Sequence, residues 1–155
     1  MITEILAVAA SVVSGLGAGV FLAFSSGVMP GLARTSDAVY VESMRGINRA
    51  VINGVFLGAI FGAVPLLVAA AVAAFAEGAT AAGWLLTASG LVYLAGVLVV
   101  TGIRNVPLNE RLERHRGTPR QAREDFERPW VRWNGLRTVA GVVATVLAVS
   151  ALIAL

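Results

Sequence analysis

Long apolar stretches alternate with shorter polar segments along the chain. Because a helix needs about 20 apolar residues to cross a bilayer, these stretches predict membrane-spanning helices at about residues 5–28, 50–76, 79–103 and 135–155. Tyr40, Met44 and Ile47 recur at helical spacing, so the segment Ser36–Arg49 is expected to continue into the second span. The pattern therefore predicts an all-α fold, with residues 1–155 forming a single integral membrane four-helix bundle.

The two longer polar segments are expected to be partly helical and to lie in the cytoplasm. Asn105-Val106-Pro107 is expected to end the third span. Further on, Thr118 and Gln121 form a capping box, and Pro129 can open the fourth helix before its apolar part begins. Small residues spaced by four predict close helix packing, namely Ser11, Gly15 and Gly19, then Gly54, Gly58 and Gly62, and finally Ala140, Ala144 and Ala148.

Composition and charge sharpen the membrane prediction. Hydrophobic residues make up 57% of the 155 residues and the mean hydropathy is +0.81, unlike an ordinary soluble domain. Cysteine is absent, which excludes disulfides and thiol chemistry. All 12 basic residues are arginines, which we interpret as codon bias of a GC-rich bacterial genome, so the expected location is a bacterial inner membrane. The mixing of these arginines with acids argues against nucleic acid as a partner. Because arginines mark the cytoplasmic side, both long loops are placed in the cytoplasm and both termini outside.

This topology gathers polar side chains at the cytoplasmic ends of all four helices. Arg137 lies one turn deeper than Arg132 and beside Thr138, so it is hard to explain as a surface anchor. Asn53 lies about one turn inside its apolar stretch, and an unpaired amide there is costly, so we expect it to face the bundle. The connectivity brings further polar residues to this depth, among them Ser25, Met29, Asn48, Arg49, Asn105, Asn109, Trp133 and Asn134.

Structural roles compete with a binding site at these positions. Trp130 and Trp133 could form an interfacial aromatic belt. Arg104 and Arg132 could reach phosphate headgroups, and the amides could join helices by hydrogen bonds. We expect Trp130 and Arg132 to anchor the fourth helix at the interface, and Trp133 to turn inward together with Arg137.

Ligands for metals and cofactors are missing from this polar cluster. No group of His, Cys, Asp and Glu has metal-ligand spacing, and the single histidine, His115, lies in a charged loop. The sequence has neither a phosphate-binding glycine loop nor a nucleophile elbow. No acid lies within the four spans, so no general base is evident. We therefore expect a site without metal or cofactor.

Four motifs, one from each span, carry a resemblance to a known family. They are "FLAFSSGVMPGLAR", "MRGINRAVINGVF", "TGIRNVPLNERL" and "WVRWNGLRT". Together they resemble the anthrone oxygenase family of small four-span membrane proteins, and the combination of "NVPLN" with "WxxWNxxRT" is the most specific part. The resemblance implies site positions at Asn48, Arg49, Asn53, Asn105, Asn109, Trp133, Asn134 and Arg137.

The resemblance implies oxidation of a planar, anthrone-like phenol by molecular oxygen, giving a quinone. Arg137 or Arg49, together with Asn134 and Asn53, would stabilise the substrate oxyanion, since charge-assisted hydrogen bonds are strong in an apolar pocket. Phe24, Phe56 or Trp133 could stack on the rings. The alternative is a non-catalytic membrane protein that binds a lipid or quinone, or scaffolds a partner. A homo-oligomer is compatible with either hypothesis.

Overall fold

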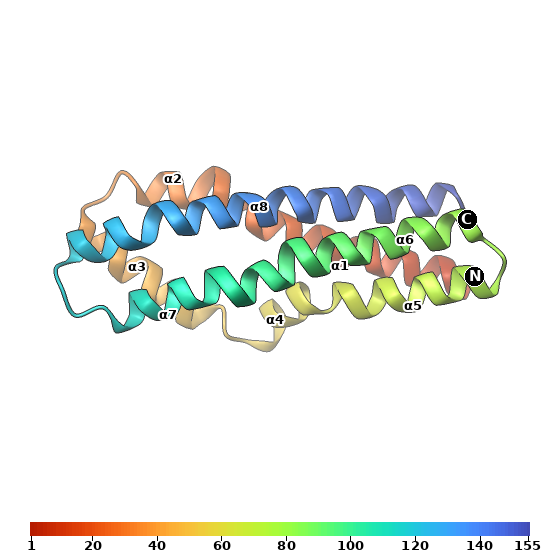
Figure 1. Cartoon of the computed structure of the whole chain (residues 1–155), viewed down its shortest axis with the longest axis horizontal. Helices are drawn as coiled ribbons and strands as arrows, with labels where there is room; N and C mark the ends of the chain where they lie inside the picture. Colours follow the sequence, from red (N-terminus) through yellow and green to blue (C-terminus); the bar gives the residue numbers. More distant parts are fainter.

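The computed structural model describes all residues from Met1 to Leu155, and its regular secondary structure is entirely helical. Four helical rods lie side by side in an elongated bundle, with both chain termini at one end (Figure 1). Four apolar helical runs are long enough to cross a membrane, which confirms the all-α prediction with four candidate spans. The runs are Ile2–Leu32, Gly54–Ala76, Thr80–Arg114 and Pro119–Ile153.

The first and third runs each contain π-helical turns, which hold one extra residue per turn. The first run consists of α1 (Ile2–Ala23), η1 (Phe24–Val28) and α2 (Met29–Leu32). The third consists of α6 (Thr80–Tyr93), η2 (Leu94–Val99), η3 (Thr101–Asn105) and α7 (Val106–Arg114).

A proline follows both η1 and η3 at the same distance. Pro30 and Pro107 are each the second residue after the π turn. Proline has no N–H for the helix ladder, and the wider π turn lets the helix continue past it. The prediction that Asn105-Val106-Pro107 ends the third helix is therefore wrong, because η3 carries the helix on into α7.

The second span begins at a break. α3 (Asp37–Ala50) ends before residues 51–53, and α4 (Gly54–Phe61) then leads past Gly62 into α5 (Ala63–Ala76). The prediction that Ser36–Arg49 continues directly into the span is wrong. Asn53 is the N-cap of α4, where its Oδ1 accepts from the Phe56 backbone N–H at 3.0 Å and its Nδ2 donates to the Ala50 carbonyl at 2.8 Å. The side chain thus stabilises the break itself.

The fourth span belongs to the longest helix, α8 (Pro119–Ile153), which has 35 residues. The predicted capping box is present, because the Thr118 hydroxyl accepts from the Gln121 backbone and the Gln121 side chain accepts from the Thr118 backbone. Pro129 lies inside α8 and does not open it. One helix therefore runs from the charged end of the bundle to the terminal end (Figure 1).

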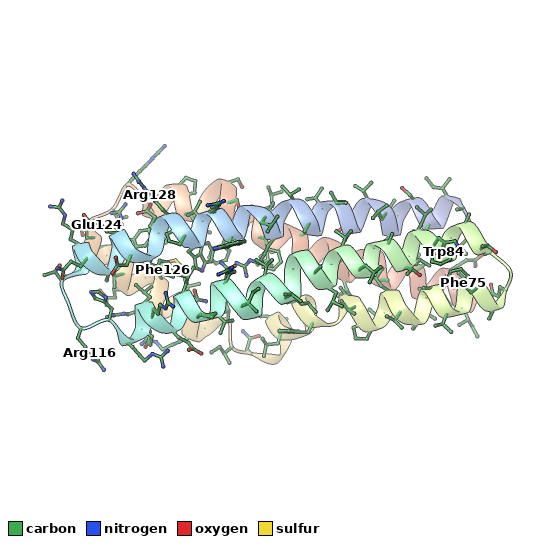
Figure 2. All side chains as sticks on the ribbon, viewed as in Figure 1. Phe75, Trp84, Arg116, Glu124, Phe126 and Arg128 are labelled. Carbon is green, nitrogen blue, oxygen red and sulfur yellow. The ribbon has the colours of Figure 1, made fainter.

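Two buried clusters divide the bundle along its length. Toward the termini the core consists largely of alanines packed with Leu67, Leu86 and Tyr93. Toward the other end α3, α7 and the first half of α8 enclose Tyr40, Met44 and Phe126. Charged side chains, including Arg116, Glu124 and Arg128, project around this second cluster, whereas Phe75 and Trp84 lie at the opposite end (Figure 2).

Small residues allow the close approach of α1 and α8. A Cβ added at Gly141 would lie 3.1 Å from the Cβ of Ala18, so there is little room for a side chain there. Ala144 and Ala148 are fully buried in the same face of α8, as predicted from their spacing. The prediction fails for Gly54 and Gly58, which are exposed and have no neighbour within 4 Å of an added Cβ, because α4 lies at the edge of the bundle.

Candidate functional site

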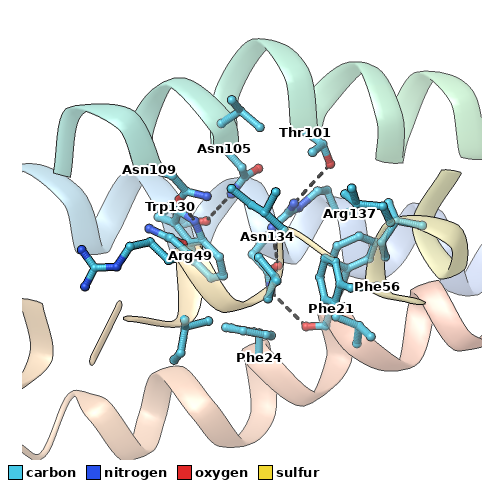
Figure 3. Close-up of a pocket in the computed structure, with 18 of the residues that line it drawn as sticks. Phe21, Phe24, Arg49, Phe56, Thr101, Asn105, Asn109, Trp130, Asn134 and Arg137 are labelled. Atoms are coloured by element: carbon cyan, nitrogen blue, oxygen red, sulfur yellow. Dashed lines mark hydrogen bonds between the residues drawn. The ribbon is translucent and has the colours of Figure 1, made fainter. Parts of the chain in front are cut away.

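A cavity of about 400 Å³ lies where the two buried clusters meet. Its walls come from α1, η1, α3, the connection between α3 and α4, α4, η3, α7 and α8, and are mostly apolar (Figure 3). Pockets of 300–1,000 Å³ with a few placed polar groups are typical of small-molecule sites. The aromatic members of the wall are Phe21, Phe24, Phe56, Phe61 and Trp130, and the polar members are Asn48, Arg49, Thr101, Asn105, Asn109, Glu110, Glu113, Asn134 and Arg137.

Arg137 is a buried cation without a carboxylate partner. Its residue is 6% exposed. One guanidinium nitrogen donates to Thr101 Oγ1 at 3.2 Å and another to Asn134 Oδ1 at 2.8 Å, while Nε has no partner. Its Cζ lies 4.4 Å from the centroid of the Phe21 ring and 5.5 Å from that of Trp130. Ring faces and neutral dipoles compensate a buried charge only in part, so the site favours a bound anion.

Asn134 holds this arrangement in place. Its Nδ2 donates to the Phe21 carbonyl at 2.9 Å and to Ser25 Oγ at 2.7 Å, while its Oδ1 accepts from Arg137. Ser25 Oγ also lies 3.1 Å from the hydroxyl of Thr138. The predicted site residues Asn134 and Ser25 therefore come together, and they join α1 to α8 and orient the guanidinium. Ser25 is not part of the cavity wall.

Of the two tryptophans of α8, Trp130 is the buried one and Trp133 the partly exposed one, the reverse of what was expected. Trp130 is 4% exposed, lines the cavity, and donates from Nε1 to Asn109 Oδ1 at 2.8 Å. Trp133 is partly exposed and lies outside the cavity wall. The Cζ of Arg104 lies over its ring, 4.8 Å from the ring centroid. The prediction that Trp133 turns inward while Trp130 anchors the surface is wrong, because Trp130 and Arg137 share a helix face and Trp133 lies beside it.

Besides Asn134, three asparagines from the predicted set line the cavity. Asn105 is 1% exposed, and its Nδ2 donates to the Trp130 carbonyl at 3.4 Å. Asn109, one turn further along, is fixed by the Trp130 indole. Asn48 comes from the last turns of α3, and its Nδ2 has no partner. The π turn η3 places Thr101 and Asn105 on the cavity side of their helix.

The mouth of the cavity is charged. Arg49 lies at the opposite end from Arg137 and points away from it (Figure 3). Its side chain is 65% exposed and pairs with Glu113 at 2.8 Å, so the prediction that Arg49 could hold the oxyanion in an apolar pocket is wrong. Glu110 and Glu113 also line the cavity, although the sequence showed no acid at this depth. They were missed because α7 was expected to be a separate loop helix, whereas it extends the third span.

The remaining predicted residues divide between the cavity and other surroundings. Phe24 and Phe56 line the cavity as expected, and the Phe24 ring lies 5.6 Å from that of Trp130. Met29 is buried in the second cluster and not in the cavity wall. Asn53 is exposed at the helix break and not turned inward, so its assignment to the oxyanion site is wrong. The structure adds Phe21, which had shown no distinct sequence signal, and Thr101, which belongs to the polar cluster that the connectivity predicts at the end of the third span.

No three His, Cys, Asp or Glu side chains come together in a group that could hold a metal ion. The cavity wall offers amides, a hydroxyl, a guanidinium and two mouth carboxylates. Such a site can bind a flat apolar molecule, hold an oxygen anion, and connect to water at its mouth.

Comparison with protein families matches residues 54–147, more than half of the chain, to the family described as anthrone oxygenase. Comparison with curated proteins and with solved structures gives no match. The matched region contains Phe56, Thr101, Asn105, Trp130, Asn134 and Arg137 and stops short of the α1 and α3 walls of the cavity. This chain, an all-α protein with four helices that could span a membrane, belongs to the anthrone oxygenase family.

Proposed function

We propose that the protein is a membrane-embedded oxygenase that acts without a cofactor and oxidises a planar, anthrone-like phenol to a quinone. Family membership supports the reaction class. The observation that carries the proposal is Arg137, a buried guanidinium with no carboxylate partner inside an aromatic cavity. Such a cation stabilises a substrate that reacts as an anion.

The chemistry needs only the substrate and molecular oxygen. An anthrone loses a proton from its methylene carbon and becomes an electron-rich anthrolate, whose charge rests largely on oxygen. The anthrolate passes an electron to dioxygen, the two radicals combine at the ring carbon, and a proton completes the hydroperoxide. Loss of water from the hydroperoxide leaves the second carbonyl. One anthrone and one dioxygen thus give one quinone and one water.

Arg137 is assigned to the oxygen of the anthrolate. Its charge favours the anion over the neutral anthrone, so it lowers the barrier to the step that makes the substrate reactive toward oxygen. Asn134 and Thr101 hold the guanidinium, which avoids reorganisation during the reaction. In this proposal Asn134 is a positioning residue, and Phe21, Phe24, Phe56 and Trp130 bind the rings.

The mouth carboxylates offer a path for the substrate proton. Glu113 pairs with Arg49, and Glu110 pairs with Arg114 at 2.9 Å. Both glutamates line the cavity and have exposed side chains, 43% for Glu113 and 57% for Glu110. A proton released from the substrate can therefore reach water by way of this end of the cavity.

A bacterial inner-membrane location, with the charged end of the bundle in the cytoplasm, is part of the proposal. The arginine-rich segments 30–49 and 104–137 lie toward one end, opposite both termini (Figure 1). Because the chain lacks cysteine, the variants Arg116→Cys and Glu77→Cys each carry a single thiol, so any label on the purified chain reports that position. Labelling of position 116 in intact cells by a membrane-impermeant maleimide would contradict this orientation.

Oxygen uptake tests the proposed activity directly. Purified protein in detergent is mixed with anthrone, and spontaneous oxidation is subtracted. We expect uptake that resists chelators and falls about 100- to 1,000-fold in Arg137→Met, as for loss of an oxyanion donor. Arg132→Met is the matched control, since Arg132 is an exposed arginine of α8 outside the cavity. Uptake no greater than background, or equal uptake by both variants, would refute the assignment.

Quinone or lipid binding without catalysis is the competing function. The cavity wall includes Ile52, which is 73% exposed, and Val106, which is 41% exposed, so an apolar ligand could reach the cavity from lipid. A pure binding protein would take up anthraquinone without consuming oxygen in the presence of anthrone.

A further inference from the structure

Three unpaired buried polar atoms on residues of the cavity wall indicate the chemistry of its ligand. Seven buried side-chain nitrogen or oxygen atoms in the chain have no hydrogen-bond partner. Three of these atoms, Asn48 Nδ2, Asn105 Oδ1 and Arg137 Nε, belong to residues of the cavity wall. Two are donors and one is an acceptor. Because unpaired buried polar groups are costly, the three atoms indicate what a ligand must supply.

The acceptor, Asn105 Oδ1, is the most informative of the three. The Asn105 amide is oriented by the Trp130 main-chain carbonyl, which can only accept, so the nitrogen must face it and the oxygen must face away. The side-chain oxygens of Asn109 and Asn134, which also line the cavity, already accept hydrogen bonds within the protein. Asn109 Oδ1 accepts from the Trp130 indole, and Asn134 Oδ1 accepts from Arg137.

The surroundings of Asn105 restrict the chemistry of the missing donor. Asn105 lies four residues after Thr101, whose hydroxyl accepts a hydrogen bond from the Arg137 guanidinium. One small ligand can therefore contact both Arg137 and Asn105. A cationic donor would be repelled by Arg137. A neutral hydroxyl on an aromatic ring meets both constraints, and the phenylalanine and tryptophan walls suit the ring itself.

We propose that Asn105 is a specificity-determining residue that accepts a hydrogen bond from a ring hydroxyl of the substrate. The hydroxyl must lie away from the carbonyl that Arg137 binds, because a hydroxyl next to that carbonyl would bond to it internally. This inference rests on the proposed function, since it places the substrate carbonyl at Arg137. The site thus selects a planar substrate with two polar ends over one that carries the carbonyl alone.

Paired ligands that differ by one methyl group test this proposal without turnover. 2-Hydroxyanthraquinone and 2-methoxyanthraquinone share the ring system and carbonyls, but only the first donates a hydrogen bond. Quenching of tryptophan fluorescence measures the binding of each, because Trp130 lines the cavity. At a pH where the hydroxyl is protonated, we expect the wild-type protein to bind the hydroxy compound about 10- to 100-fold more tightly.

Two variants separate recognition from general damage to the cavity. Asn105→Leu should abolish the preference by weakening only the hydroxy compound. Asn109→Leu is the matched control, and it should weaken both compounds alike and keep their ratio. Equal binding of the two ligands by the wild-type protein, binding of neither, or a ratio retained in Asn105→Leu would overturn the proposal.

The two proposals can be refuted independently. If the protein prefers the hydroxy compound through Asn105 but consumes no oxygen with anthrone, recognition by Asn105 stands and the oxygenase proposal is refuted. If the protein oxidises anthrone but binds both ligands equally, the oxygenase proposal stands and recognition by Asn105 is refuted.

Discussion

Replacing Arg137 should separate stability from activity. The guanidinium makes two hydrogen bonds, to Thr101 and Asn134. Hydrogen bonds to a charged group contribute about 1.5–3 kcal/mol each, whereas burying a charge without a counterion costs several kcal/mol. The two effects oppose each other in Arg137→Met. We therefore expect the free energy of unfolding to change by less than about 2 kcal/mol, while oxygen uptake falls at least 100-fold.

Asn134→Leu provides the contrast at the neighbouring position. The amide makes hydrogen bonds to Phe21, Ser25 and Arg137, and its loss leaves the buried charge with less support. The sum of these contributions is about 3–5 kcal/mol. A structural residue and a functional residue, one turn apart on the same helix, should thus differ in stability although both lose activity.

Unfolding by SDS in detergent micelles, followed by tryptophan fluorescence, measures the stability of each variant. Oxygen uptake with anthrone measures activity, and Arg132→Met controls for loss of an arginine from α8. If Arg137→Met were destabilised as much as Asn134→Leu, the guanidinium would be a structural link between helices. The reasoning from its missing carboxylate partner would then be refuted.

Four further substitutions test the assignments around the cavity. Trp130→Leu should weaken quinone binding about tenfold or more by removing the indole wall, whereas Trp133→Leu should leave the dissociation constant within about threefold, as ligand titration will check. Arg49→Gln breaks an exposed ion pair and should change SDS unfolding by less than about 1 kcal/mol; a 100-fold loss of oxygen uptake would contradict its position at the mouth. Asn53→Ala should cost about 1 kcal/mol through loss of the α4 cap, with unchanged ligand binding.

The sequence indicated the general location of the site because connectivity alone brings the helix ends together. Their positions near the predicted cytoplasmic ends of the spans were enough to select Arg137, Asn134, Asn105 and Asn109. All four residues line the same cavity. Their partners were harder to assign. The predictions for Asn53 and Trp133 were wrong for different reasons. Asn53 caps α4 at the helix break and is exposed there, and Trp133 lies beside the cavity-facing side of α8. A shift of one residue in a helix turns a side chain by about 100°, enough to move it off the cavity wall.

By itself, the sequence determined that this chain forms four long apolar helices and that its charges gather at one end, because hydrophobic length and arginine distribution are local properties of the chain. Only the tertiary structure decided which side chains face one another. The π turns before Pro30 and Pro107, the cap at Asn53 and the close contact of Gly141 with Ala18 set the rotation and spacing of the helices. Those features leave Arg137 buried without a carboxylate partner, since its environment depends on residues from three separate helices that no local pattern relates.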